Sequence, residues 1–255
     1  MPTEGVWTSP EGKKVFIPLE NNPEVFTSLV HDLGVSPDLG FYDVYSIDEP
    51  SLLSMVPRPA HALIFITPAP MYWSVREQDG IPQAKDRLSY DGAGDEEPVT
   101  WFLQTMGNAC GLIALLHAVA NGDARRFVKD GSLLDHLLKE GAPLKPRDRA
   151  DLLYNSRELE EAHMRAARRG DTSAPRADEH CGYHFIAFTK GKDGHLWELE
   201  GGCDGPVDRG MLPEDADMLS EEALKKGIRK YLEFANGNLE FSIVALANRT
   251  EGDGG

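Results

Sequence analysis

The sequence has few cysteines, no excess of basic residues and no long hydrophobic run. Three cysteines, Cys110, Cys181 and Cys203, are too few and too unevenly spaced for a disulfide framework, which favours a reducing compartment. With 26 Lys and Arg against 42 Asp and Glu, the net charge of −16 argues against nucleic acids and anionic membranes as partners. No stretch approaches the roughly 18 apolar residues of a membrane span. The N-terminus MPTEGVWTSP lacks both the basic and the apolar region of a secretory signal. We therefore expect a cytoplasmic location, with the nucleus as an alternative.

Helical and strand-like patterns alternate along the chain, with no internal repeat and no marked domain boundary. We expect helices near residues 23–33, 71–79, 110–119, 132–141, 146–161 and 214–236. Strand-like runs are FYDVYSID, ALIFITP, YHFIAFTKG, HLWELEG and FSIVALAN. Hairpin signals late in the chain, such as Asp193-Gly194, favour antiparallel pairing. These patterns predict a single α+β domain over residues 1–248 with a largely antiparallel sheet, followed by a short polar tail, 249–255.

The run QTMGNACGLIALLHAVA contains the strongest chemical signal. Cys110 stands where an apolar helix begins, and a helix N-terminus favours the thiolate that a nucleophilic cysteine needs. Gln104 precedes it by six residues, close enough for its amide to stabilise a developing oxyanion together with the Cys110 backbone N–H. Taken alone, the cysteine is more often a small buried thiol, and the glutamine a solvated loop residue.

His184 is the best candidate for a general base, because its strand YHFIAF would hold the ring rigidly. A lone histidine on such a strand is more often an ordinary core residue. His117 lies too far along the helix to meet Cys110. The spacing His180-Cys181-x-x-His184 resembles a metal corner, but zinc needs about four converging ligands and no second cluster follows. We expect no metal and no cofactor.

A carboxylate should orient the imidazole, and two lie on one face of the next strand. Of Glu198 and Glu200, the better candidate is Glu200, near the strand end and followed by two glycines. Asp193 and Asp204 are further candidates, and any of the four could be a surface acid.

These residues and the segments around them resemble the ubiquitin C-terminal hydrolase family of cysteine deubiquitinases, in particular its compact single-domain members. The resemblance extends over nearly the whole chain, through PLENNPEVF, LLSMVPRP, QTMGNACGLIALLHAVAN, APRADEHCGYHFIAF, HLWELEGG and FSIVALA. It implies a papain-like cysteine peptidase fold, with a central antiparallel sheet flanked by helices and a knotted backbone.

The resemblance also implies the roles of the candidate residues. Cys110 would be the nucleophile, His184 the general acid and base, and Gln104 the oxyanion donor. A crossover loop of about residues 162–181 would restrict the leaving group, so that small adducts and short tails are removed from the C-terminal glycine of ubiquitin. The expected partner is ubiquitin, and the expected oligomeric state is a monomer.

One residue departs from the family pattern. The family usually has aspartate, as in LYELDG, where this chain has Glu200 in LWELEGG. Glutamate keeps the charge but adds a methylene, so it can orient the histidine only if the backbone retreats by about 1 Å. Two rival hypotheses follow: a related NEDD8-like modifier as the substrate, or a catalytically silenced ubiquitin-binding module.

Overall fold

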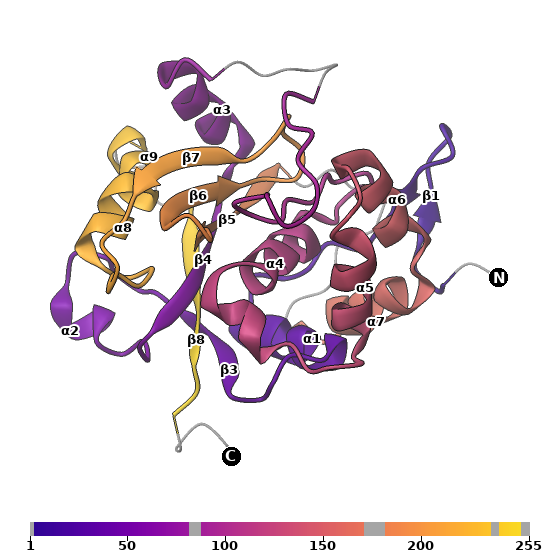
Figure 1. The fold of residues 1–255 in the computed structure, drawn as a ribbon, viewed down its shortest axis with the longest axis horizontal. Helices are drawn as coiled ribbons and strands as arrows, with labels where there is room; N and C mark the ends of the chain where they lie inside the picture. Colours follow the sequence, from indigo (N-terminus) through magenta and orange to yellow (C-terminus); the bar gives the residue numbers. More distant parts are fainter. Residues whose placement is uncertain (1–2, 82–87, 171–181, 236–239, 251–255) are drawn as a thin grey trace.

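The computed structural model describes residues 3–81, 88–170, 182–235 and 240–250 (Figure 1). Within them, six strands form a central sheet in the order β3-β8-β4-β5-β6-β7, and every neighbouring pair is antiparallel. The strands are β3 (Leu39–Asp43), β4 (Ala60–Pro68), β5 (Tyr183–Lys190), β6 (His195–Leu199), β7 (Val207–Met211) and β8 (Ser242–Asn248). A small separate ribbon pairs β1 (Trp7–Thr8) with β2 (Lys14–Val15).

Helices cover both faces of the sheet (Figure 1). One layer contains α1 (Pro23–Leu33), α4 (Cys110–Ala120), η1 (Gly122–Phe127), α5 (Leu133–Gly141), α6 (Pro146–Asn155) and α7 (Arg157–Ala167). The other contains α2 (Pro50–Leu53), α3 (Ala69–Gln78), α8 (Glu221–Lys226) and α9 (Ile228–Phe234). The arrangement confirms the α+β class and the antiparallel sheet between helices.

Strand periodicity divides the core between the two layers. Side chains alternate across a strand, so a strand buried on both faces reads as a continuous apolar run. In β4, Ile64 and Ile66 pack with the α4 layer, while Leu63 and Phe65 pack with the α3 and α9 layer. The apolar run ALIFITP is thus explained by burial on both faces.

Local signals at the ends of the first long helix explain where it begins and ends. The side chain of Asn22 accepts hydrogen bonds from the N–H groups of Glu24 and Val25, and Pro23 occupies the first turn. Gly34 ends the helix in the left-handed region, at φ 105°. The strand expected over 41–48 instead spans Leu39–Asp43, and β7 was not predicted at all.

The strand nearest the C-terminus lies inside the sheet, between two strands from the first 68 residues of the chain. Strand β8 pairs with β3 on one side and with β4 on the other. The chain therefore returns to its own N-terminal part to complete the sheet, which a reader can follow in Figure 1. The knotted path implied by the family resemblance also involves residues outside the described ranges, and it stays a prediction.

The predicted start of the crossover loop is wrong. Residues 162–167 form the last part of α7, because Leu159, Ala162, His163 and Ala166 are buried at helical spacing behind the Ser156 cap. A loop can begin only after Ala167, and most of the expected segment, 171–181, lies outside the described residues.

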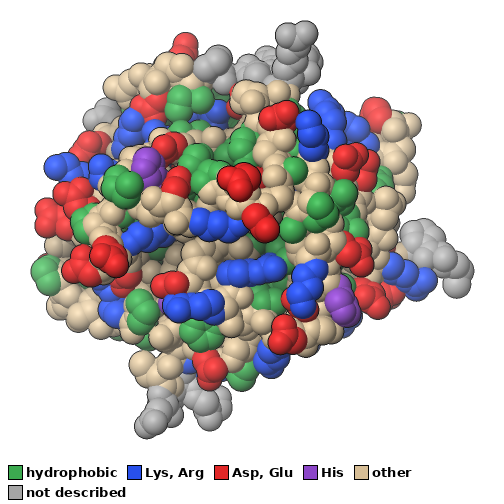
Figure 2. All heavy atoms as spheres, viewed as in Figure 1, with side chains coloured by type: hydrophobic (Ala, Val, Ile, Leu, Met, Phe, Trp, Pro, Cys, Tyr) green, Lys and Arg blue, Asp and Glu red, His purple; other side chains and the backbone are tan. Residues whose placement is uncertain are grey.

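Acidic and basic side chains are interspersed on the face of the molecule shown in Figure 2. The negative net charge is therefore not matched by a uniformly acidic surface on this side. In the described part of the chain, no helix has the length and apolar character needed to cross a membrane.

A buried histidine joins the N-terminal segment to α7. The ring of His163 is fully buried, packs on Phe16 at 4.8 Å between centroids, and its Nε2 lies 2.8 Å from the carbonyl oxygen of Ile17. A carbonyl only accepts, so Nε2 carries a hydrogen, and the lowered pKa of the buried ring leaves it neutral at pH 7. Burial lowers the pKa of His163 to about 4, and the hydrogen bond to Ile17 opposes this only in part.

This histidine makes the fold less stable in acid. Between the unfolded pKa of about 6.5 and the folded pKa near 4, the unfolded chain binds the extra proton, so stability falls as pH falls. We expect that in His163→Gln the free energy of unfolding falls less steeply with falling pH, by up to about 1.4 kcal/mol per pH unit. Urea unfolding at pH 6.5, 5.5 and 4.5 measures it, with His136→Gln, at an exposed position, as the control. Equal slopes for His163→Gln and wild type would contradict this prediction.

Candidate active site

Cys110 is the first residue of α4, as predicted, and the only partly exposed residue of a helix that is otherwise buried. Ala109 is the N-cap, and its carbonyl oxygen accepts from the N–H of Ile113 at 2.9 Å. Just before it, Asn108 has φ 55°, the left-handed conformation that asparagine adopts more readily than most residues. This sharp turn lets the chain enter the helix directly at the cysteine.

The N-terminal segment fixes the loop that precedes Cys110. Gly107 donates its N–H to Lys14 O and accepts from Phe16 N, both at 2.9 Å. A Cβ at Gly107 would lie 2.9 Å from a methyl group of Val15, so only glycine allows this approach. Phe16 is buried in the core, so this part of the N-terminal segment is packed into the domain.

Gln104 is held beside the end of β6. Its backbone N–H donates to Gly201 O at 2.8 Å, and its side-chain Nε2 donates to Met106 O at 3.0 Å. A Cβ on Gly201 would come within 3.1 Å of Gln104 Cβ. The predicted oxyanion donor is therefore next in space to the residue that follows Glu200.

His184 and Glu200 meet as predicted, with Nδ1 and Oε1 3.3 Å apart. His184 lies on β5, and Glu200 comes directly after the end of β6, the neighbouring strand. Glu200 is buried, and burial alone would raise its pKa. Hydrogen bonds from His184, Cys203 and the backbone N–H of Gly202 outweigh burial and hold the pKa of Glu200 below its ordinary value. The carboxylate is therefore ionised and can only accept, so the hydrogen sits on His184 Nδ1.

The N-terminal end of α4 lies beside the first residues of β5. A Cβ built on Gly111 would lie 3.5 Å from the ring of Phe185. Gly111 follows Cys110 and Phe185 follows His184, so the elements carrying the two residues are in van der Waals contact. The structure thus joins His184 to Glu200, and Gln104 to the residue after Glu200, and it places the helix that begins at Cys110 against the strand that carries His184.

Two aromatic residues that the sequence did not reveal hold the imidazole. Tyr72 stacks on the His184 ring with centroids 5.5 Å apart and planes at 22°. Trp73 meets the same ring edge-on at 5.4 Å and 82°. Both come from α3, predicted as a helix without any sign that it reaches the site. Neighbouring aromatic residues on a helix are more often core, so the sequence contained no specific signal for them.

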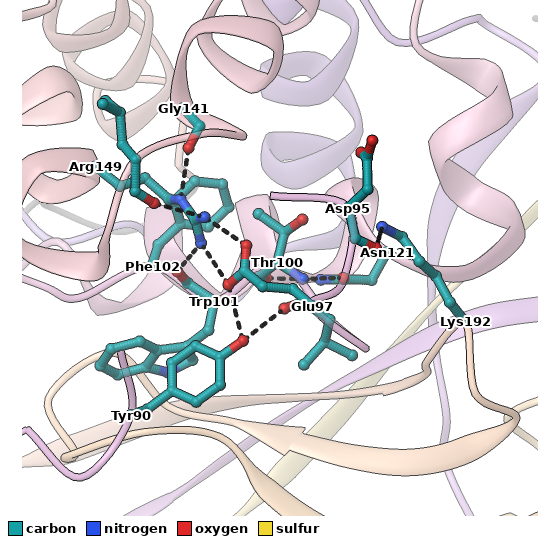
Figure 3. Close-up of polar contacts among 12 residues, drawn as sticks. Tyr90, Asp95, Glu97, Thr100, Trp101, Phe102, Asn121, Gly141, Arg149 and Lys192 are labelled. Carbon is teal, nitrogen blue, oxygen red and sulfur yellow. Dashed lines mark hydrogen bonds and ion pairs between the residues drawn. The ribbon is translucent and has the colours of Figure 1, made fainter. Parts of the chain in front are cut away.

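A buried arginine fixes the segment that leads to Gln104 (Figure 3). Arg149, fully buried on α6, donates to both oxygens of Glu97, at 3.2 and 2.6 Å. It also donates to the carbonyl oxygens of Trp101, Gly141 and Leu144. Its five N–H groups thus have partners, which a buried guanidinium requires. Arg149 was not predicted, because nothing marks it among the charges of a polar helix.

Helix α4 fixes the same segment from the other side. His117 Nε2 accepts from the N–H of Phe102 at 2.9 Å, and Asn121 bonds both the N–H and the carbonyl of Thr100. Burial lowers the pKa of His117 to about 3, so the ring stays neutral and can accept. His117 is thus away from Cys110, as expected, but it positions the loop that carries Gln104.

The other candidate acids have different partners. Glu198 pairs with Arg209, Asp204 pairs with Arg76, and Asp193 accepts from the indole of Trp197. His195 forms a second histidine–carboxylate pair with Asp208, at 2.9 Å on the more exposed end of β6. Among the residues that the structure describes, no group of three or more His, Cys, Asp or Glu side chains could hold a metal ion.

Comparisons with known proteins agree with this geometry. The family model described as ubiquitin carboxyl-terminal hydrolase, family 1, matches residues 16–233. Ubiquitin carboxyl-terminal hydrolase 3 of Arabidopsis thaliana is 35% identical over 238 residues, covering 93% of this chain and 96% of that protein. Ubiquitin carboxyl-terminal hydrolase isozyme L1 of Homo sapiens is 36% identical over 230 residues, covering 90% and 96%.

Solved structures support the fold. The Trichinella spiralis UCH37 catalytic domain bound to ubiquitin vinyl methyl ester matches with a TM-score of 0.67 at 22% identity, covering 91% of this chain and 95% of that one. At this level of identity, the match carries the fold alone.

If the Arg149–Glu97 pair fixes this segment, breaking it should lower the stability of the fold and loosen residues 100–104. Glu97→Gln leaves a buried guanidinium without its counter-charge, which should destabilise the fold by about 3–5 kcal/mol. Amides of residues 100–104 should then exchange with solvent faster than those of β4. Urea unfolding and hydrogen exchange measure both effects. The control is Glu161→Gln, which removes the exposed ion pair to Arg157 and should change neither. Equal behaviour of the two variants would contradict the role of Arg149.

Proposed function

Because the chain belongs to the ubiquitin carboxyl-terminal hydrolase family 1, we propose that it is a thiol-dependent deubiquitinating hydrolase. It cleaves the bond after the C-terminal glycine of ubiquitin through an acyl-enzyme on Cys110. The observation that carries the proposal is the His184–Glu200 contact at 3.3 Å, with Gln104 bonded to Gly201 beside it. A silenced binding module would have no reason to retain this arrangement.

The tautomer of His184 decides which atom moves the proton. Nδ1–H donates to Glu200, which leaves Nε2 as the basic atom. In the proposed mechanism, Nε2 takes the thiol proton of Cys110 and then gives it to the leaving amine or thiol. It next removes a proton from water, and the resulting hydroxide releases the acyl group. Glu200 stays ionised and stabilises the imidazolium at each stage.

Two donors would stabilise the oxyanion that forms when the thiolate attacks the glycine carbonyl. One is the backbone N–H of Cys110 at the start of α4, where helix N–H groups point outward. The other is the Gln104 amide, one of whose N–H groups bonds Met106 O and orients it. The second N–H remains for the oxyanion. The chemistry is complete with protein groups and water.

The finer parts of the proposal concern the substrate, the oligomeric state and the location in the cell. We propose ubiquitin as the partner, with small adducts or short tails as leaving groups, and a NEDD8-like modifier as the alternative to be tested in the same assay. We also propose a monomer in the cytoplasm. Light scattering at micromolar concentration and fluorescence imaging of the tagged protein check these two points.

Substitutions in the site should lower the rate of hydrolysis by different amounts, according to the role proposed for each residue. With ubiquitin carrying a C-terminal fluorogenic amide, we expect no turnover from Cys110→Ala and a loss of about 10⁵-fold or more in kcat/KM from His184→Ala. Glu200→Gln should cost less than His184→Ala, about 10²- to 10⁴-fold, because it removes orientation but not the base. Gln104→Ala should lower kcat about 10²-fold.

The chain offers a matched control for the histidine. His195→Ala removes the His195–Asp208 pair at the start of β6 and should leave kcat/KM within twofold of wild type. Equal losses from His195→Ala and His184→Ala would contradict the assigned base. Tight ubiquitin binding without turnover by the wild-type protein would favour the silenced module.

A further inference from the structure

Glu200 uses its two carboxylate oxygens differently. Oε1 faces His184 and also accepts from the N–H of Gly202 at 2.9 Å. Oε2 accepts from the thiol of Cys203 at 2.8 Å. Cys203 is 7% exposed, and the chemistry proposed above makes no use of it.

The thiol is held in turn by groups from α3. Arg76 Nη1 donates to Cys203 Sγ at 3.1 Å and to Tyr72 Oη at 3.0 Å. Tyr72 Oη lies 3.2 Å from both Cys203 Sγ and a carboxylate oxygen of Glu198. Arg76 is buried and pairs with Asp204, so its position is fixed. Arg76 thus donates to the sulfur of Cys203, and the thiol of Cys203 donates to Glu200.

The protonation state of Cys203 agrees with a donor role. Burial, reinforced by the negative charge of Glu200, raises the pKa of the thiol well above its ordinary value. The sulfur therefore keeps its hydrogen at neutral pH, and the carboxylate oxygen 2.8 Å away accepts it.

Glutamate needs such a donor more than aspartate does. Its extra methylene adds a rotatable bond, so the carboxylate can turn away from the imidazole unless both of its oxygens are held. Gly202 and His184 hold one oxygen, and Cys203 holds the other. Tyr72 connects the two parts, because its ring stacks on His184 while its hydroxyl contacts Cys203.

We propose that Cys203 is a positioning residue for the reaction, which fixes the second oxygen of Glu200 so that the first one faces His184. The inference rests on the proposed hydrolase function. It explains how this chain uses glutamate in place of the aspartate usual in the family.

The test compares Cys203→Ala, which removes the donor, with Cys203→Ser, which keeps one. With the fluorogenic ubiquitin amide, Cys203→Ala should lower kcat by about tenfold or more while KM stays within twofold. Cys203→Ser should stay within threefold of wild type. Adding Cys203→Ala to Glu200→Ala should cause no further loss, because Cys203 acts only through Glu200. Thermal unfolding of each variant checks that it folds.

A second readout does not depend on turnover. In protein with ¹⁵N-labelled histidine, the Nδ1–H proton of His184, assigned by its loss in His184→Gln, reports the bond to Glu200. It should keep its wild-type shift in Cys203→Ser and move upfield or exchange away in Cys203→Ala.

Several results would overturn the proposal. They are equal activity of the alanine and serine variants, an equal further loss in the Glu200→Ala background, or an unchanged proton resonance in Cys203→Ala. If wild type does not cleave ubiquitin, the proposed function fails, but the resonance still decides whether Cys203 positions Glu200.

Discussion

The end of strand β6 is the constraint on which the site depends. The carboxylate of Glu200 holds His184, its backbone carbonyl accepts from the indole of Trp101 at 3.1 Å, and the next carbonyl, of Gly201, accepts from Gln104. The proposed general base, His184, and the proposed oxyanion donor, Gln104, are thus fixed to two consecutive residues. The loop that continues from Gln104 then leads to Cys110 within six residues. The relative positions of these side chains therefore depend on hydrogen bonds at one strand end, where a small displacement would disturb the site.

Buried charge supports this strand end on both sides. Arg149 and Glu97 hold the segment before Gln104. On the other side, Arg76 pairs with Asp204 and bonds Cys203 and Tyr72, while Glu198 pairs with Arg209 and accepts from Tyr72. Such pairs add little net stability, since desolvation cancels much of their attraction, but removing one partner is costly. Because each buried charge needs its own partner, these ion pairs hold the loops beside the strand end in one arrangement. The same burial keeps His117 neutral, so that it can accept from Phe102.

The residues to which the proposal gives chemical roles could be picked out from the sequence because their signals are local. Cys110 at a helix start, Gln104 six residues earlier and His184 in an apolar strand each follow from short patterns, and the family resemblance joined them. Strand alternation gave both Glu198 and Glu200, and the position of Glu200 near the strand end, before two glycines, made it the better candidate. The supporting residues were not predictable, because Arg149, Tyr72 and Cys203 act through contacts between elements distant in sequence. The start of the crossover loop was misplaced because the charges of α7 obscured its buried alanines.

The most direct test of this account displaces the strand end without removing any of the proposed catalytic groups. In Gly201→Ala, the new Cβ would meet Ile113 Cγ2 at 2.6 Å, Phe102 O at 3.0 Å and Gln104 Cβ at 3.1 Å. Gly182→Ala is the control, since a Cβ there, two residues before His184, meets nothing within 4 Å. We predict that Gly201→Ala binds ubiquitin but loses tenfold or more in kcat, roughly the effect of a 1 Å displacement at an active site. Gly182→Ala should retain wild-type kcat, with folding of both verified by thermal unfolding. Wild-type turnover by folded Gly201→Ala would contradict the account.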